Sequence, residues 1–400
     1  MKALRNYLDK IKPNFEEGGK LAMFRSVFDG FETFLFVPNS TSKTGVHIHD
    51  AADSKRTMII VVLALIPALL FGMYNTGYQH YLAIGQDPGF LEMFIYGLLA
   101  VLPKIIVSYL VGLGIEFAIA QVKNEEIQEG FLVSGILIPM IIPVDTPLWM
   151  IAVATAFAVV FAKEVFGGTG YNIFNVALVT RAFLFFAYPG DMSGDQVWVR
   201  TGDTFGIGAG NVVDAFSGAT PLGQISVATK DMIGNFQTVD ILGNPLSLWD
   251  MFVGLIPGSI GETSILAILL GAALLIFTGV ASWKIMASVF VGGLGMSAIF
   301  NLIGTTVPMS VSPMEQILLG GFAFGAVFMA TDPVTASRTE TGKYIYGLLI
   351  GAMAIIIRTL NPGYPEGMML AILLMNIFAP LIDYYVVEAN INRRLKRAVK

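Results

Sequence analysis

The residues with the clearest chemical potential form one run of small side chains, Asp214-Ala-Phe-Ser217-Gly218-Ala219-Thr220. Taken alone, such a run is typical of a turn, because its hydroxyls can bond to nearby backbone and its glycine allows positive φ. The chain has no cysteine, and its three histidines are His47, His49 and His80. Without thiolates there is no disulfide, no thiolate zinc site and no iron–sulfur cluster ligated by this chain alone. If the protein handles electrons, an organic cofactor must carry them.

A second kind of chemistry is suggested by Glu116, Asp332 and Asp383, which stand in or beside apolar segments. An ionised side chain at the bilayer centre costs roughly 2.5–3.5 kcal/mol, so each one needs a reason. A carboxylate cluster could form a sodium entry site, because hard cations prefer oxygen ligands. The structural alternative is that Asp332 caps a helix junction and Asp383 only reaches the interface. Arg181, in the middle of another apolar segment, is expected to pair with a carboxylate.

Composition places these residues in a membrane protein. Of 400 residues, 55% are hydrophobic and 13% are charged, whereas roughly 25% are charged in a soluble domain. This composition cannot form an apolar core beneath a wet surface, so we expect an all-α polytopic membrane protein. The net charge of −5 gives no reason to expect nucleic acid as a partner.

The apolar runs predict about ten transmembrane helices, because a helix needs about 20 mostly apolar residues to cross the hydrocarbon. The ten segments are 57–74, 93–122, 130–143, 148–163, 172–188, 264–281, 284–303, 314–331, 344–359 and 367–387. Segment 93–122 is long for a straight crossing and predicts tilt or a kink at Pro103. Segment 130–143 is short and ends in proline, which favours a half-helix buried against protein.

Lysine and arginine set the orientation. With ten spans, 19 of the 24 basic residues fall at the two termini or in loops on the same side. We therefore expect both termini in the cytoplasm. The predicted parts are a cytoplasmic extension at 1–56, helices one to five within 57–188, an outer loop at 189–263, helices six to ten within 264–387 and a basic tail at 388–400.

A weak internal repeat is visible in the apolar segments. Residues 148–188 read as helix, Gly170-Tyr171 loop and helix, and residues 344–387 repeat this order around Gly363-Tyr364. Either coincidence among glycine-rich segments or a five-plus-five inverted repeat with a central site explains the pattern.

The run that ends at Thr220 resembles the recognition pattern of flavin transferases: Asp, two variable residues, Ser or Thr, Gly, Ala, and the acceptor Thr or Ser. The resemblance implies that FMN is joined through its phosphate to the Thr220 hydroxyl, with Asp214, Ser217, Gly218 and Ala219 as the recognition residues. The attaching enzyme works outside the cytoplasmic membrane, on the side to which the charge count assigns Thr220. Small neighbours would let the hydroxyl enter that enzyme's active site.

Longer segments carry a wider resemblance that covers essentially the whole chain. The sequence resembles the B subunits of Na⁺-translocating NADH:quinone reductases in residues 163–188, 254–262 (GLIPGSIGE), 318–337 (LLGGFAFGAVFMATDPVTAS) and 361–380 (NPGYPEGMMLAILLMNIFAP). The D subunits of Rnf complexes share the membrane core and the flavin loop. They generally lack an extension like residues 1–55, so the quinone reductase is preferred.

The resemblance also implies a second flavin and a quinone. Riboflavin would lie towards the cytoplasmic side, against Gly170, Asn172 and Asn175, although these residues also suit a tight turn with an asparagine cap. Quinone would bind near Gly112, which is equally a small packing position. Arg181 could neighbour a reduced flavin instead of a carboxylate.

The implied role is that of one component of a multi-protein complex in the inner membrane of a bacterium. Electrons would pass from NADH in a partner to FMN, then to riboflavin and quinone, with Na⁺ export. The implied partners are an NADH-oxidising flavoprotein, a second FMN-bearing protein, small membrane proteins, quinone, Na⁺ and lipid. The residues alone leave two other classes open, a cofactor-free secondary transporter and a structural scaffold. A transporter would be colourless after purification, whereas a flavoprotein would be yellow.

Overall fold

The computed structural model describes residues 2–16, 18–25, 28, 30, 32, 36, 44–46, 54–123, 130–194, 197–214 and 216–398. Within these residues the chain is helical and forms no strand, only two isolated bridges, Thr204–Ile207 and Val239–Pro245. This confirms the all-α prediction for the described part of the chain. His47, His49 and several other stretches of the predicted extension lie outside the described residues.

Six helical segments are long and apolar enough to cross a membrane, so the chain is a multi-pass membrane protein. They are Lys55–Ala83, Phe90–Lys123, Leu148–Phe166, Trp283–Ile303, Glu340–Leu360 and Met368–Arg397. The corresponding elements are α3 (Ser54–Ala83), α4 (Phe90–Lys123), α6 (Leu148–Ala158) with a π-helix (Val159–Lys163), α11 (Trp283–Ile303), α15 (Glu340–Leu360) and α16 (Met368–Ala398).

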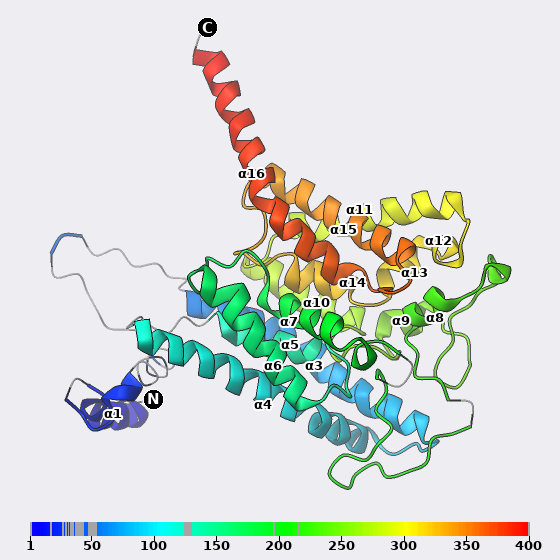
Figure 1. The fold of residues 1–400 in the computed structure, drawn as a ribbon, viewed down its shortest axis with the longest axis horizontal. Helices are drawn as coiled ribbons and strands as arrows, with labels where there is room; N and C mark the ends of the chain where they lie inside the picture. Colours follow the sequence, from blue (N-terminus) through cyan, green and yellow to red (C-terminus); the bar gives the residue numbers. More distant parts are fainter. Residues whose placement is uncertain are drawn as a thin grey trace.

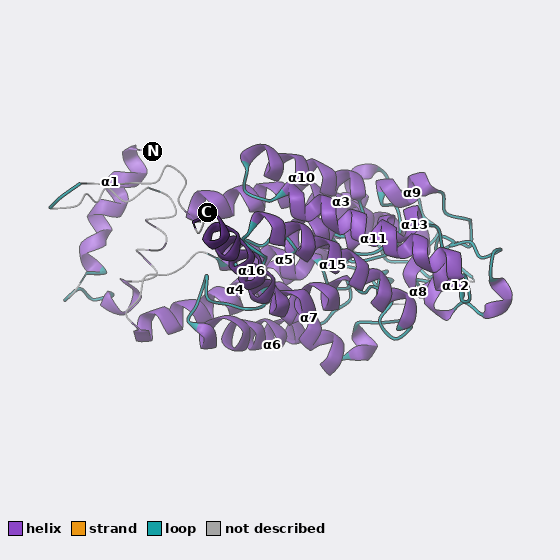
Figure 2. Cartoon of the chain, turned by 90° about the horizontal axis from the view of Figure 1, so that it is seen from above, coloured by secondary structure: helices purple, strands orange, loops and turns teal. Residues whose placement is uncertain are grey.

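Three further apolar helices are shorter: α5 (Phe131–Met140), α7 (Val176–Ala187) and α10 (Ile265–Thr278). The remaining helices are α1 (Lys2–Ile11), α8 (Pro221–Val227), α9 (Leu248–Val253), α12 (Val307–Ser310), α13 (Pro313–Leu318) and α14 (Phe322–Phe324). Most of the long helices pack into one bundle around a large apolar core (Figure 1). In Figure 2, α8, α9 and α12 gather at one end of the molecule and α1 lies at the other.

The predicted span 314–331 is broken. Helix α13 ends at Leu318, Gly320 adopts a φ of +66°, and the chain resumes as α14 and a π-helix (Gly325–Met329). The break has a packing cause, because a Cβ at Gly321 would stand 2.6 Å from a carboxylate oxygen of Glu262. The short α5 confirms that segment 130–143 is a short helix rather than a full span. Helix α4 continues through Pro103.

Helices α3 and α4 approach each other at glycines. A Cβ at Gly97 would lie 1.7 Å from the carbonyl oxygen of Met73, and one at Gly77 would lie 1.9 Å from that of Met93. Small residues allow such close backbone approach, which supplies van der Waals contact between membrane helices. The pair of glycines therefore fixes the distance between the two helices.

We predict that Gly97→Ala destabilises the protein, whereas Gly114→Ala on the same helix does not. An added methyl at Gly97 forces α3 and α4 apart, and overpacking costs typically about 1–3 kcal/mol. At Gly114 no atom lies within 4 Å of the new Cβ. The apparent melting temperature in detergent measures the difference. Equal melting temperatures for the two variants would contradict this account of the helix contact.

The segment 189–263, predicted as the outer loop, is tied to α3 by His80. The ring is buried and stacks on Tyr96 with centroids 3.9 Å apart. Its Nδ1 lies 2.7 Å from the carbonyl oxygen of Arg200, and its Nε2 lies 2.8 Å from that of Gly208. Both contacts can be hydrogen bonds only if both ring nitrogens carry protons. His80 thus lies inside a long helix, although the sequence placed it outside the apolar segments.

Candidate functional site

Thr220 occupies the N-cap of α8. Its backbone is extended, and its Oγ1 accepts a hydrogen bond from the backbone N–H of Gly223 at 3.0 Å. Pro221 follows at the first helical position, where its missing N–H costs nothing. The sequence thus forms a short capped helix that holds the threonine hydroxyl in a defined place, which loop composition alone did not predict.

Gln224 and apolar contacts fix this helix to the rest of the segment 189–263. The Gln224 amide donates to the carbonyl oxygen of Val239 at 2.9 Å and accepts from the Val239 N–H at 2.9 Å. Leu222 and Ile225 are buried in a small cluster with Met251 and residues that precede α14. The Thr220 hydroxyl is therefore carried by a supported element.

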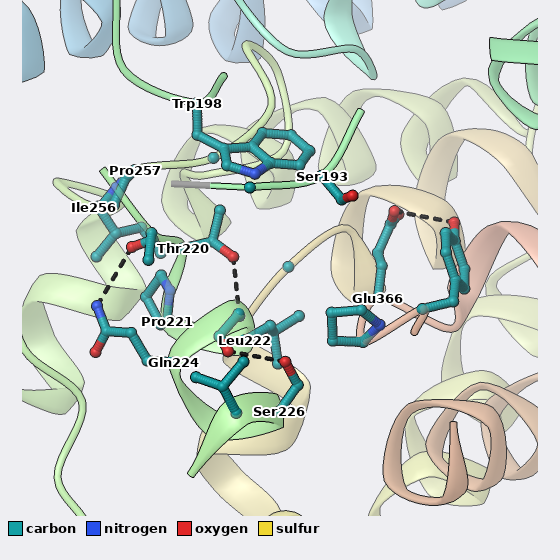
Figure 3. A pocket seen from close by; sticks show the side chains of 18 of the residues that line it. Ser193, Trp198, Thr220, Pro221, Leu222, Gln224, Ser226, Ile256, Pro257 and Glu366 are labelled. Carbon is teal, nitrogen blue, oxygen red and sulfur yellow. Dashed lines mark hydrogen bonds between the residues drawn. The ribbon is translucent and has the colours of Figure 1, made fainter. Parts of the chain in front are cut away.

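Beside Thr220 lies a large cavity, with a volume of about 680 Å³. This falls within the roughly 300–1,000 Å³ of pockets that bury organic ligands. Trp198 and Thr220 line it together with Leu222 and Glu366, and Figure 3 shows Thr220 between the indole of Trp198 and the start of α8. In the same view Glu366 lies across the cavity from Thr220. We call this cavity the outer pocket, after the side on which the sequence predicts residues 189–263 to lie.

The floor of the outer pocket is charged. Arg181 of α7 is buried, and its Nη1 donates to Glu262 Oε1 at 2.8 Å. Its Nη2 pairs with Glu366, which also accepts a hydrogen bond from the Tyr364 hydroxyl at 3.0 Å. The expected pairing of Arg181 with a carboxylate is confirmed, and the guanidinium has two such partners. Apolar walls above a fixed guanidinium suit an aromatic ligand that carries negative charge.

The remaining residues of the run lie along the approach to Thr220. Asp214 is exposed, Ser217 and Ala219 are half-buried, and Gly218 is buried. The Ser217 N–H reaches the carbonyl oxygen of Ile241 at 3.5 Å. Residue 215 lies outside the described part of the chain.

A second, smaller cavity of about 90 Å³ contains two of the three residues expected at riboflavin. Asn172 and Asn175 line it, and Gly170 lies exposed in the same turn without lining it. Asn175 caps α7 through Leu178 and donates to Asp332 Oδ2 at 3.1 Å. The expected cap is therefore present, and the side chain faces the cavity as well. We call this cavity the inner pocket, after the cytoplasmic side on which riboflavin is expected.

The three carboxylates expected on a sodium path have separate partners. Glu116 pairs with Lys163, and both side chains are about 5% exposed. Asp332 accepts from the Val334 N–H and from Asn175. Asp383 receives hydrogen bonds at the start of α15 from Ser337, Arg338 and Thr339. Within the described ranges, no group of three or more His, Cys, Asp or Glu side chains is placed to hold a metal ion.

Gly112, expected near quinone, packs against α5. A Cβ there would stand 1.9 Å from the ring of Phe131, so the glycine allows that ring to lie on α4. Lys104, earlier on the same helix, is buried and donates to the carbonyl oxygen of Ala100 at 2.9 Å.

Sequence reasoning did not assign roles to Glu262, Glu366, Lys163 and Trp198, which build the two sites. One signal for the first two was available, because buried Arg181 required carboxylate partners and both glutamates stand in segments that carry the resemblance. Nothing in the local pattern pointed to Trp198, which reaches the pocket from an irregular loop.

Comparison with known proteins identifies close relatives over the full chain. A family described as "NQR2, RnfD, RnfE family" matches residues 41–392. The chain is 45% identical to the B subunit of the Na(+)-translocating NADH-quinone reductase from Ectopseudomonas mendocina (strain ymp), covering 99% of this chain and 100% of that protein. The protein of the same name from Pseudomonas paraeruginosa is 45% identical, with 98% and 99% covered, and that from Klebsiella pneumoniae (strain 342) is 44% identical, with 98% and 99% covered.

Proposed function

The chain belongs to the NQR2, RnfD, RnfE family, and from this membership we propose that it is the B subunit of a Na⁺-translocating NADH:quinone reductase. It would work in the inner membrane of a bacterium, within a complex that passes electrons from NADH to quinone and exports sodium. The preference over an Rnf-type protein rests on relatives that bear the quinone reductase name over their whole length.

The observation that carries the electron-transfer role is the position of the Thr220 hydroxyl on the wall of a cavity of about 680 Å³. We propose that FMN is esterified to this hydroxyl and that its ring occupies the outer pocket. The residues fit such a group, since Trp198 and Phe185 offer apolar walls and Arg181 offers a buried positive charge. When bound, a flavin supplies electron carriage that the chain lacks, having no cysteine. The chain itself would tether the flavin, orient its ring and shield it from water.

The cap at Thr220 is compatible with that ester. The hydroxyl oxygen accepts from the Gly223 N–H, so its own hydrogen is not needed for the cap. Replacing this hydrogen by a phosphoester leaves the oxygen where it is. We infer that α8 keeps the attachment point fixed before and after modification.

For the inner pocket we propose the second, non-covalent flavin, riboflavin. The support is a correspondence between the pockets. Each is lined by a loop that joins two apolar helices, by a glycine that precedes a short helix (Gly130 before α5, Gly321 before α14), and by residues at or just before the start of α3 or α10. An inverted five-plus-five repeat would produce this pairing of pockets at opposite faces. The volume of about 90 Å³ is below the usual range for organic ligands, so binding requires side chains there to move.

The rest of the sequence hypothesis stands as a set of predictions about the complex. Quinone would bind near Gly112, sodium would pass by Glu116, Asp332 and Asp383, and partner proteins would supply NADH oxidation and a second FMN. Ten crossings, with both termini in the cytoplasm, would place the outer pocket on the opposite face.

The first test concerns the membrane topology. Because the chain has no cysteine, an introduced cysteine is its only thiol and can be labelled selectively. We expect Asp231→Cys, in the exposed outer loop, to react with an impermeant maleimide in intact cells. Arg397→Cys, in the exposed basic tail, should react only after permeabilisation. Labelling of the tail alone in intact cells would put Thr220 in the cytoplasm and overturn the proposal.

A further inference from the structure

Two carboxylates share one guanidinium at the floor of the outer pocket. Arg181 contacts Glu262 through Nη1 and Glu366 through Nη2, and the glutamates come from loops before α10 and before α16. Both carboxylates also converge on Gly321, where a Cβ would stand 2.6 Å from Glu262 Oε1 and 2.8 Å from Glu366 Oε1. Two like charges are therefore held close together with one cation between them.

The remaining polar partners are unequal. Glu366 accepts a hydrogen bond from the Tyr364 hydroxyl in addition to Arg181. Arg358, behind the same loop, donates to the backbone carbonyl oxygens of Gln316, Leu319 and Glu366. Glu262 has Arg181 and the nearby Ser259, which lies in its own segment. The loop that carries Glu366 is thus held by more polar contacts than the segment that carries Glu262.

The charge of the floor depends on one proton. With both glutamates ionised, the charges of Arg181, Arg358, Glu262 and Glu366 sum to zero. With one glutamate protonated, the net charge of these four side chains is positive. Two carboxylates at one site cannot both ionise freely, so the pair tends to retain a shared proton. Because Glu262 and Glu366 both line the cavity, the charge of an occupant acts directly on that equilibrium.

We propose that Glu262 is the charge-compensating carboxyl of the outer pocket, taking up a proton when negative charge enters the pocket and releasing it when that charge leaves. This rests on the proposed function, which supplies the electron, from NADH by way of a partner protein. The proton comes from the water that reaches the pocket. It forms an O–H bond on Glu262, and on reoxidation that bond breaks and the proton returns to water.

The protonation energetics support this assignment. Burial raises the pKa of Glu262 to about 7, the Arg181 guanidinium opposes that rise, and repulsion from Glu366 adds to it. A carboxyl with such a pKa is protonated below neutral pH and ionised above it. Added negative charge raises the pKa further, so proton uptake would occur at and just above neutral pH. Burial and Glu366 also raise the pKa of the Tyr364 phenol, which therefore stays protonated there.

The experiment is a redox titration of the flavin-bearing complex at pH values on either side of 7. One proton per electron shifts the midpoint potential by about 59 mV for each tenfold change in proton activity. We expect the outer flavin of the unmodified protein to show a steeper pH dependence than that of Glu262→Gln. Asp231→Asn, an exposed acid in the same outer loop, should titrate like the unmodified protein.

Infrared difference spectra give a readout that does not depend on turnover. Reduction should produce a protonated-carboxyl band in the unmodified protein, Glu262→Asp should shift it, and Glu262→Gln should remove it. An unchanged potential slope together with a persistent band in Glu262→Gln would overturn this inference while Thr220 still carries flavin. A chain without flavin on Thr220 would instead overturn the proposed function, so the two failures are distinguishable.

Discussion

Thr220→Ala will remove all covalently bound flavin from this chain. The hydroxyl at position 220 is the only atom of that side chain able to form a phosphoester, and it opens onto the outer pocket. The measurement is in-gel fluorescence of the chain made together with a flavin transferase, with mass spectrometry of the peptide that contains residue 220. We expect complete loss of both signals.

Matched variants separate loss of the hydroxyl from loss of the helix cap. Thr220→Ala also removes the N-cap of α8, which typically costs about 1 kcal/mol. Thr220→Asn keeps a capping side chain without a hydroxyl and should also lack flavin, whereas Thr220→Ser keeps both and should retain it. Thr229→Ala removes another hydroxyl that lines the same cavity and should remain fluorescent. Fluorescence in the Asn variant would show that the flavin is attached elsewhere.

The membrane class and several helices could be predicted because they follow from average properties of long segments. Hydrophobic composition and the length of apolar runs located α3, α4, α11, α15 and α16, each with some error at its ends. The first span was predicted to stop at residue 74, yet α3 continues to Ala83 because polar His80 finds carbonyl partners in the outer loop. Such compensation depends on residues more than a hundred positions away.

The broken segment 314–331 was predicted as one span because most of its residues are apolar. The break has two causes, a local backbone conformation and a tertiary contact. Gly320 adopts positive φ, and Gly321 leaves room for carboxylates from two distant loops. An average of hydropathy over the segment reflects neither requirement, so the break between α13 and α14 and the pocket beside it could not be predicted from composition.

Of the candidate site, Thr220 could be singled out from the sequence but its surroundings could not. A linear pattern of small residues is enough to mark Thr220. The pocket beside it is assembled from α7, the loop before α10, the break before α14 and the loop before α16. Those contacts cannot be predicted from a single sequence. The position of Arg181 within an apolar segment did indicate that carboxylates must lie near it.

The second large effect that we expect is a loss of stability when the Glu116–Lys163 ion pair is broken. Both side chains are about 5% exposed, and they join α4 to the π-helix that follows α6. Glu116→Gln leaves the Lys163 ammonium buried without a counter-charge, and breaking a buried pair in this way costs about 3–5 kcal/mol. We expect a large fall in the melting temperature of this variant in detergent. A fall no larger than that of an exposed control such as Glu388→Gln would contradict the burial of the pair.

The double variant Glu116→Gln/Lys163→Met separates stability from sodium handling. Replacing both partners of a buried pair by neutral groups is often neutral or stabilising, so most of the lost stability should return. Among the atoms that the structure describes, Glu116 Oε2 is buried and has no hydrogen-bond partner. A carboxylate oxygen in that state is available to a hard cation. We therefore expect the reassembled complex with the double variant to be stable but deficient in sodium transport. Recovery of both properties would reduce Glu116 to a structural partner of Lys163.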